Sequence, residues 1–442
     1  MLGIVVSRAD AASVEIGRQL RALADWTAHQ DSDRPDADGG GTVYRLNGIE
    51  LREFDGLHVD LEQPARAFGE LRLLVFVSRH SGDTGPLLTA HHPGNIGPAE
   101  YGGAPNKVPR AAPKALSDIL ESFRSLAPAG YEVGLECTHH GPTAVGAPAL
   151  FVEVGSGEPQ WSDPDAAAAA ARAVLRFRDT EPWVERSFVG IGGGHYAPRF
   201  DRIVRETDWH VGHIAADWGL RAAGTVPDAL LGELFERSRA DLAVIEGDHP
   251  ELVDRIRDHG YRVVSESWLR ETDGVPQKTV ERFEAALKPV ADGLRFGRPA
   301  RSVDERTAVE ILEPAPDLLA AVNGTDAVRV RDAYRHSAVA FETAESGNRV
   351  TGRVAVAGRS DWEGIEGAFI ELLRERFADV AVTDAEIVVT EQAFDPDRAK
   401  ELGVEPGPAF GRLAEGEPVT VGSGEVRPEA VHETRTRRYP RC

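Results

Sequence analysis

The sequence predicts an α/β fold, in which a mostly parallel sheet carries helices on both faces, followed by a smaller α+β domain. Over residues 1–270, short apolar runs alternate with segments of helical spacing, an order typical of parallel sheets. Histidine-rich motifs follow several of these apolar runs. After about residue 270 the alternation stops and prolines interrupt the pattern. We therefore expect a catalytic domain of residues 1–270 and a C-terminal α+β extension of residues 271–442.

Short apolar runs predict the strands of the first domain. Such runs, about four to eight residues long and bounded by turn-forming residues, are typical of buried strands. Asn47-Gly48 is a strong turn dipeptide and predicts a hairpin between two of them. The predicted strands are residues 2–8, 43–46, 49–54, 71–77, 131–135, 149–154, 184–191, 209–215, 241–245 and 261–265.

Helices are predicted between these strands. The first begins near Ala11, with apolar residues at the spacing of one helical face. The helix over 163–177 follows two good N-caps, Ser162 and Asp163, and contains six consecutive alanines. The other predicted helices are residues 113–126, 227–237 and 250–259. The polar, glycine-rich segment 31–41 is expected to be a flexible insertion.

The C-terminal extension contains alternating and amphipathic segments without a catalytic cluster of its own. Residues 350–357 and 387–392 predict strands, and residues 362–377 predict an amphipathic helix. Residues 435–441 form the one concentrated basic segment of the chain. We interpret this segment as a solvated, disordered end, with a phosphate-binding tail as the alternative.

The charge of the chain is strongly negative. Seventy-two Asp and Glu face 50 Lys and Arg, of which only five are lysine, and the formal net charge is −22. Acidity spread over the whole chain keeps a protein soluble where salt screens repulsion, and it resembles proteins of salt-accumulating haloarchaea. The strong apolar periodicity argues against an acidic disordered chain. We attribute the acidity to a high-salt solvent and not to a binding partner, so it does not exclude a nucleic-acid partner.

The expected compartment is the cytoplasm. No apolar run approaches the roughly 20 residues needed to span a bilayer. The first residues read as a strand and lack the basic start of a signal peptide. Two cysteines, Cys137 and Cys442, cannot make a disulfide framework, which suits a reducing compartment. We expect no membrane association, no obligate protein partner and a monomeric state.

Four predicted strands end in histidine motifs: His80, His139 with His140, His195, and His249. In open α/β sheets, ligands bind outside the carboxyl ends of the strands. Imidazole and carboxylate are the ligands that catalytic zinc prefers. The sequence therefore predicts a site for one or two ions at one edge of the sheet, with ligands drawn from His80, His91, His139, His140, His195, Glu136, Glu153 and Asp248.

Adjacent side chains point to opposite sides of an extended segment, so His139 and His140 are not expected to bind one ion side by side. One could be a ligand and the other a base, or each could serve a different ion.

The glycine run 192–194 could hold a phosphate or an oxyanion on its amides, with a tight turn as the alternative. Cys137 is expected to be a packing residue, with a nucleophile or a soft metal ligand as the alternative. The expected bystanders are His29, His58, His259, His336 and His432.

Taken together, six motifs resemble the archaeal and plant type of D-aminoacyl-tRNA deacylase. They are residues 78–82, 91–95, 136–143, 151–155, 161–163 and 190–199, and the resemblance extends over residues 1 to about 270. The combination of Thr-His-His-Gly-Pro at 138–142 with Gly-Gly-Gly-His-Tyr-Ala-Pro-Arg at 192–199 is the specific part. The resemblance implies a fold like those of peptidyl-tRNA hydrolase and nucleoside phosphorylases.

The resemblance also implies zinc-dependent hydrolysis that frees D-amino acids of many kinds from tRNA, a step of translation quality control. We assign catalytic roles to His139, His140, His195, Glu136 and Thr138. Substrate contacts are expected from Gly192, Gly193, Gly194, Tyr196, Arg199, Arg79 and Asn95. The expected metal ligands are His80, His91, His139, His195 and Glu153.

A second resemblance lies in the C-terminal extension. Residues 399–413 and 416–419 look like a segment of tRNA 3′-processing endonucleases of the metallo-β-lactamase class, whose metal-binding motif is absent here. This segment implies at most a tRNA contact. Two other functions stay open: a different metal-dependent hydrolase of small esters or amides, and a non-catalytic protein that binds tRNA or nucleotide. Stoichiometric zinc would exclude the binding protein, and charged tRNA as a substrate would exclude the small-ester hydrolase.

Overall fold

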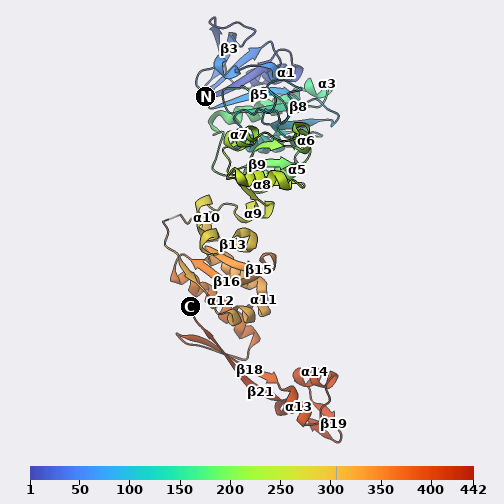
Figure 1. The fold of residues 1–442 in the computed structure, drawn as a ribbon, viewed down its shortest axis with the longest axis vertical. Helices are drawn as coiled ribbons and strands as arrows, with labels where there is room; N and C mark the ends of the chain where they lie inside the picture. The colour runs from blue at the N-terminus through green and yellow to red at the C-terminus, as the bar shows by residue number, and fades with distance from the viewer. Residues whose placement is uncertain (305) are drawn as a thin grey trace. The chain divides into compact units, whose positions relative to one another are not determined.

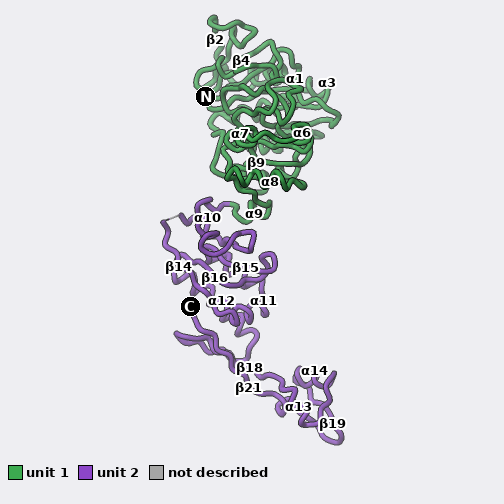
Figure 2. The backbone as a smooth tube through the Cα atoms, viewed as in Figure 1, with its two compact units in different colours: residues 1–273 green, residues 274–442 purple. Residues whose placement is uncertain are grey.

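The computed structural model describes residues 1–304 and 306–442 and divides into two compact units. Unit 1 comprises Met1–Asp273 and unit 2 comprises Gly274–Cys442 (Figure 2). In the described part of the chain, no helix is both long and apolar enough to cross a membrane. Each unit has its own sheets and helices (Figure 1).

Unit 1 is built on an eight-stranded mixed sheet. The order is β2 (Thr27–Asp31), β3 (Gly41–Leu46), β4 (Ile49–Phe54), β1 (Leu2–Ser7), β5 (Leu73–Arg79), β8 (Ala149–Gly155), β6 (Leu87–His91) and β7 (Glu132–Leu135). Its centre, β4-β1-β5-β8, is parallel. The predicted hairpin at Asn47-Gly48 is present between β3 and β4. Segment 31–41, predicted to be a flexible insertion, connects β2 to β3, which pair as a further hairpin.

The two strands at the far side of this sheet run in the opposite direction. β6 pairs antiparallel with β8, and β7 pairs parallel with β6. The strand that follows β5 directly was missing from the sequence prediction, because its residues Leu87–His91 contain polar side chains and end in a histidine loop. The carboxyl ends of β5 and β7 therefore do not share one edge, and the prediction of a single histidine edge is wrong.

A second, four-stranded sheet completes unit 1. It is parallel throughout, in the order β10 (His210–Ala215), β9 (Ser187–Gly192), β11 (Leu242–Glu246) and β12 (Arg262–Val264). The sequence predicted one sheet where the structure has two. The two sheets meet after β7, where Cys137 N donates to His195 O at 2.9 Å and Glu136 pairs with Tyr196 as an isolated bridge. This junction brings His195 to the motif at 136–143.

Three helices pack against one another and against the large sheet: α1 (Ala11–Leu23), α2 (Pro113–Leu126) and α4 (Pro164–Leu175). α1 lies on the face that presents Val6, since a Cβ on Gly17 would be 3.0 Å from that side chain. Over Phe76 and Phe151, on the other face, the core is closed by Leu61, Phe68, Val145 and Ala147, which lie outside long helices. Helices on both faces were predicted, but loops and short turns cover this face and leave room for a cavity.

The remaining α-helices of unit 1 are shorter, and all but α3, which contacts α1 and β8, belong to the part of the chain around the second sheet. They are α3 (Glu158–Trp161), α5 (Pro198–Glu206), α6 (Asp217–Ala223), α7 (Asp228–Ser238), α8 (Pro250–Asp258) and α9 (Glu266–Glu271). Leu230, Leu231, Leu234 and Phe235 of α7 pack with Val189 and Ala243 in a separate core. The second sheet therefore has its own apolar support.

Unit 2 begins with α10 (Gln277–Ala286) and contains a four-stranded sheet with two long helices. The sheet has the order β13 (Leu294–Phe296), β15 (Ala340–Ala344), β16 (Arg349–Val356) and β14 (Glu310–Leu312), and its pairs are antiparallel. The helices are α11 (Pro316–Ser337) and α12 (Arg359–Arg376). Tyr334, Trp362 and Phe369 join them in one core.

A two-stranded ribbon leads from this core to a small module. β18 (Glu386–Phe394) pairs along its length with β21 (His432–Pro440), and β17 (Asp379–Val382) flanks β18. The module between the ribbon strands contains α13 (Pro396–Glu401), α14 (Pro408–Ala414), β19 (Val419–Val421) and β20 (Gly424–Val426) (Figure 1). Its core is made by Ala399, Val404, Leu413, Val419 and Val431.

The basic segment 435–441 belongs to this ribbon, so its prediction as a disordered end is wrong. Its arginines are paired with carboxylates: Arg435 with Glu433, Arg437 with Glu391, Arg438 with Glu386 and Arg441 with Glu366. Alternation of Thr, Arg and Tyr suits a strand whose arginines face solvent and neighbouring acids. The segment is basic in the sequence, but its charges are compensated by carboxylates of β18, of β21 itself and of α12.

Candidate active site

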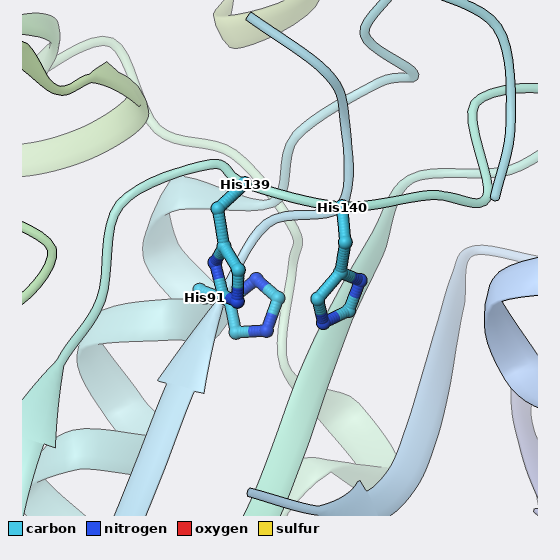
Figure 3. A group of neighbouring side chains, drawn as sticks. All are labelled: His91, His139 and His140. Carbon is cyan, nitrogen blue, oxygen red and sulfur yellow. The ribbon is translucent and has the colours of Figure 1, made fainter. Parts of the chain in front are cut away.

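Three histidines converge over the face of the large sheet. His91 is the last residue of β6, and the side chains of His139 and His140 project from the loop after β7 (Figure 3). One ligand nitrogen from each can be chosen so that all three lie within 4.8 Å of one another. The ring centroid of His91 is 4.3 Å from that of His139 and 4.7 Å from that of His140. We call these three residues the histidine cluster.

The prediction that His139 and His140 point to opposite sides is wrong. Their ring centroids are 4.4 Å apart, and both rings point toward His91 (Figure 3). The prediction assumed an extended backbone, but the segment after Leu135 is not a strand. Gly94 N donates to His140 O and Gly141 N donates to Tyr101 O, so the loop is tied to a neighbouring one. This irregular path turns the two rings to the same side.

All three histidines are anchored through the same ring nitrogen. Nδ1 lies 3.1 Å from His92 O in His91, 2.8 Å from Cys137 O in His139, and 2.7 Å from Gly141 O in His140. A backbone carbonyl only accepts, so Nδ1 carries the proton and Nε2 presents a lone pair. Burial lowers the pKa of all three, that of His140 to about 4, which keeps them neutral. Metal-ligating histidines are typically fixed in this way.

A second group surrounds Glu136, which is 1 % exposed. Its carboxylate lies 3.1 Å from His195 Nε2, 3.5 Å from His80 Nε2 and 3.7 Å from His139 Nε2. Burial would raise the pKa of Glu136, but the hydrogen bond to His195 and the neighbouring imidazoles outweigh it and lower the pKa to about 2. Tyr196 Oη is 2.9 Å from His80 Nε2. His80, Glu136 and His195 form a donor set separate from the histidine cluster.

His195 is protonated in this arrangement. Burial lowers its pKa, but the contacts with Cys137 and Glu136 raise it to about 10. Glu136 is the closer partner, since Cys137 Sγ is 4.0 Å from His195 Nδ1. Cys137 is fully buried, consistent with the packing role expected from the sequence.

Glu153 faces both groups from β8. It accepts a hydrogen bond from Ser78 Oγ at 2.7 Å, and its Oε1 lies 3.6 Å from His91 Nε2 and 4.0 Å from His140 Nε2. Burial and the nearby Glu136 raise its pKa to about 7. A carboxyl group that titrates near neutrality, beside three imidazole lone pairs, has the properties of a general base.

Two buried atoms without partners indicate that the histidines and glutamates described above could hold a metal ion. Within the described residues, His91 Nε2 and Glu136 Oε1 are buried and lack any hydrogen-bond partner. Buried polar atoms are costly unless they are satisfied, and a cation would satisfy both kinds of donor. Imidazole nitrogens with carboxylate oxygens are a set that zinc accepts. His91, His139 and His140 offer one such site, and His80, Glu136 and His195 offer a second.

A cavity of about 460 Å³ opens above these residues. The histidine-rich wall includes His80, His139, His140 and His195, with Phe151 and Glu153 on the sheet. The wall also contains Asp10, Leu57, His58, Val59, Arg79 and Tyr101. His58, expected to be a surface bystander, is 3 % exposed and part of this wall, so that expectation is wrong. Tyr101 is 67 % exposed.

Three of the predicted site positions, Thr138, Asn95 and Arg199, do not line this cavity. Thr138 Oγ1 is 3.0 Å from His213 Nδ1 and is buried. Asn95 donates to the carbonyls of Gly102 and Ala104 and so shapes the loop that carries Tyr101. Arg199 is bound to Glu266 and to Ile245 O.

The glycine run and His249 belong to a different place in unit 1. Gly193 has φ of +79°, and a Cβ there would lie 2.6 Å from Glu246 Oε2. His249 Nε2 is 2.9 Å from Asp217 Oδ1, and His249 and Asp248 line another cavity. The run therefore serves close packing against β11, as the tight-turn alternative proposed. His249, predicted at the common histidine edge, does not join the histidine cluster.

The sequence analysis did not identify four residues that line the cavity: Asp10, Ser78, Tyr101 and Phe151. Ser78 and Phe151 had a usable signal. Glu153 and Phe151 are two apart on one strand and so share a face, and Ser78 is the β5 partner of Glu153. Asp10 and Tyr101 come from loops far from the histidine motifs in the chain, and only the tertiary fold brings them there.

Two buried histidines behind the site predict how stability depends on pH. Burial lowers the pKa of His92 to about 3 and that of His213 to about 4, and His92 Nδ1 and His213 Nε2 bind backbone carbonyls. Above pH 6.5 both are neutral whether folded or unfolded. Below that pH the unfolded chain binds protons that the folded chain does not. We expect the free energy of unfolding to fall by about 1.4 kcal/mol per pH unit for each residue, down to about pH 4.

Urea unfolding of unit 1 at pH 7.5, 6.5 and 5.5, at constant salt, measures this slope. In a His92→Gln variant, which does not titrate, the slope should be smaller by the contribution of one histidine. An identical slope in the variant and the wild type would contradict the assignment.

Comparisons with known proteins agree on one family. The family model described as D-aminoacyl-tRNA deacylase matches residues 68–264. A D-aminoacyl-tRNA deacylase of Natronomonas pharaonis is 49% identical over 99% of this chain and 100% of the relative. That of Haloarcula marismortui is 48% identical, again over 99% and 100%. A crystal structure of a conserved protein of unknown function has a TM-score of 0.56 at 25% identity, covering 62% of this chain and 98% of that one.

Proposed function

Because this chain belongs to the D-aminoacyl-tRNA deacylase family, a family of hydrolases, we propose that unit 1 uses zinc to hydrolyse the ester between a D-amino acid and the 3′-terminal adenosine of tRNA. The products are the free D-amino acid and tRNA. The observation that carries the proposal is the convergence of three anchored, neutral imidazoles beside a buried glutamate, at a cavity that His139, His140 and Glu153 line. Both donor sets lie in unit 1, as does the family match.

His91, His139 and His140 would hold the first zinc ion through Nε2. Bound zinc lowers the pKa of a coordinated water toward about 7 and polarises an ester carbonyl. His80, Glu136 and His195 would hold a second ion, so the chain would carry one or two. Without a second ion, the ionised Glu136 balances the charge of protonated His195.

Glu153 would act as the general base. It takes a proton from the attacking water, while the water oxygen bonds to the ester carbonyl carbon. When the carbon–oxygen bond to the ribose breaks, the 3′-oxygen leaves with that proton. Ser78 fixes one carboxylate oxygen of Glu153 by its hydrogen bond, which holds the group toward the cavity. General acid–base catalysis of this kind contributes on the order of 10²–10⁴ in rate.

The end of the tRNA would enter beside Tyr101 and Arg79. Tyr101 is an exposed aromatic ring at the cavity, suited to stacking on a base. Arg199 and Arg202 are already paired with Glu266, and the arginines of β21 are paired with acids. Arg79, whose guanidinium lies over the Trp161 ring at 5.2 Å, is the arginine that lines the cavity. We propose that it contacts a phosphate of the acceptor end.

The cavity favours this substrate over a small ester. With about 460 Å³ it accommodates the aminoacyl group with part of a nucleotide, and most of the residues that line it are polar or charged. We therefore propose that the enzyme accepts many side chains but selects by chirality, because an L-amino acid would clash near the histidine cluster.

The test is the release of D-tyrosine and L-tyrosine from charged tRNA. We expect kcat/KM for D-tyrosyl-tRNA to exceed that for L-tyrosyl-tRNA by about 100-fold or more. D-Tyrosine methyl ester, which lacks the tRNA, should be a poor substrate. Equal rates for the two hands would refute selection by hand, and faster cleavage of the methyl ester would favour the small-ester hydrolase.

A further inference from the structure

The wall of the cavity also contains a buried carboxylate without a cationic partner. Asp10 is 3 % exposed and lines the cavity. Its Oδ1 accepts the amide of Ser13 and its Oδ2 accepts that of Arg79, each at 3.0 Å. Among the described residues, neither a lysine nor an arginine side chain forms an ion pair with it. The guanidinium of Arg79 stacks on Trp161 instead.

The nearest titratable group does not neutralise Asp10. His58 Nδ1 is 3.9 Å from Asp10 Oδ2, but burial lowers the pKa of His58 to about 4 in spite of the carboxylate. At neutral pH the imidazole is uncharged. A buried carboxylate that keeps only two amide hydrogen bonds is costly, and a cation entering the cavity would offset that cost.

Asp10 lies within reach of the reaction centre. Phe151 connects the two, since its ring centroid is 6.0 Å from that of His58, the neighbour of Asp10, and 4.7 Å from that of His140. Ser78, which binds Glu153, and Arg79, which donates its backbone amide to Asp10, are consecutive residues at the end of β5. The carboxylate and the proposed base are thus held by neighbouring residues of one strand.

We propose that Asp10 binds the α-ammonium group of the aminoacyl ester, and this inference rests on the proposed function. The α-ammonium is the one cation at the acyl end of that substrate, two bonds from the carbonyl carbon. Oδ1 and Oδ2 each keep a free lone pair for its N–H groups. The amide bonds to Ser13 and Arg79 fix the direction of the carboxylate, so the ammonium position is fixed as well.

This contact explains how one rigid site distinguishes the two hands without recognising a side chain. With the carbonyl carbon at the histidine cluster and the ammonium at Asp10, two substituents of Cα remain, hydrogen and the side chain. Exchange of the two is the whole difference between D and L. The L side chain then occupies the direction that hydrogen takes in the D substrate. Asp10 is therefore a specificity-determining residue.

The experiment compares D-phenylalanyl-tRNA with 3-phenyl-D-lactyl-tRNA, in which a hydroxyl replaces the ammonium at nearly the same size. We expect wild-type kcat/KM to be on the order of 10- to 100-fold higher for the aminoacyl substrate, the range of a charge-assisted hydrogen bond. In Asp10→Asn the ratio should fall to about one, and the preference for D- over L-phenylalanyl-tRNA should fall with it.

Asparagine and serine are both good N-caps, so Asp10→Asn and Asp10→Ser keep the start of α1, and either variant is sufficient if the other does not fold. Asp395→Asn removes a capping carboxylate of α13 in unit 2 and should keep the wild-type ratio. A ratio near one in the wild type, or an unchanged ratio in both Asp10 variants, overturns the role of Asp10. Failure of the wild type to cleave either ester refutes the proposed function itself.

Discussion

Replacement of His139 by alanine should remove activity together with zinc. We expect kcat/KM for D-tyrosyl-tRNA to fall by on the order of 10³-fold or more, because a zinc-bound water loses its low pKa when the ion is lost. Elemental analysis of the purified variant should give well below one zinc per chain. The same result is expected for His91→Ala and His140→Ala, since each supplies one of three converging Nε2 atoms. A chelator should reproduce the loss in the wild type.

His29→Ala is the matched control, because His29 lies exposed on β2 in the same unit. It should keep both zinc and activity. Wild-type protein that contains no zinc and resists chelation would contradict the metal site outright. A His139→Ala variant that loses zinc but keeps activity would assign the ion a structural role.

Replacement of Glu153 by glutamine should lower kcat by on the order of 10²–10⁴-fold while the zinc content stays constant. Glutamine has the same shape and can still accept the Ser78 hydroxyl, so the fold should persist. The pKa of Glu153, raised to about 7 by burial and by Glu136, also predicts the pH profile. A base acts when deprotonated, so wild-type kcat should fall about tenfold per pH unit below that pKa. A cation at the histidine cluster lowers the pKa, so the acid limb lies at or below pH 7.

The Glu153→Gln variant should lack this acid limb. Glu132→Gln, an exposed residue of β7, is the control and should retain the full profile. Ser78→Ala should have an intermediate kcat, since it frees the carboxylate without removing it. A Glu153→Gln enzyme that retains wild-type kcat and the same acid limb would contradict the assignment of the base.

The sequence was sufficient to predict which histidines and glutamates come together, but not where in the fold they do so. Histidine and glutamate motifs after apolar runs indicated metal chemistry, and His80, His91, His139, His140, His195, Glu136 and Glu153 do lie together. The prediction placed them past one edge of a parallel sheet. The reversal of β6 and β7 instead places them over the face of β8. Strand direction depends on pairing partners that are distant in the chain, which local periodicity does not contain.

Residues whose type commonly has a structural role, such as helix capping, were the hardest to assign to the site. Asp10 looks like a helix cap in the sequence, and it is one; its second role depends on a cavity made by distant segments. His58 has no motif around it. Conversely, Thr138 and the glycine run are next to histidines in the chain, but Thr138 contacts His213 and Gly193 packs closely against Glu246. Adjacency in an irregular loop does not determine which way a side chain points.

The ribbon of unit 2 has a consequence for how the chain can vary. Phe394 pairs with His432 at the end of β18 and β21, so the chain leaves and re-enters the ribbon at neighbouring positions. To the rest of the protein, the 395–431 module is therefore equivalent to one tight turn. The pairing of β18 with β21 already holds the two ends of the module together, so it offsets the entropic cost of closing this loop. That cost rises only slowly with loop length. Insertions, deletions or whole replacements of the module can accumulate there without disturbing the core around Trp362, as happens at the tip of any well-paired hairpin.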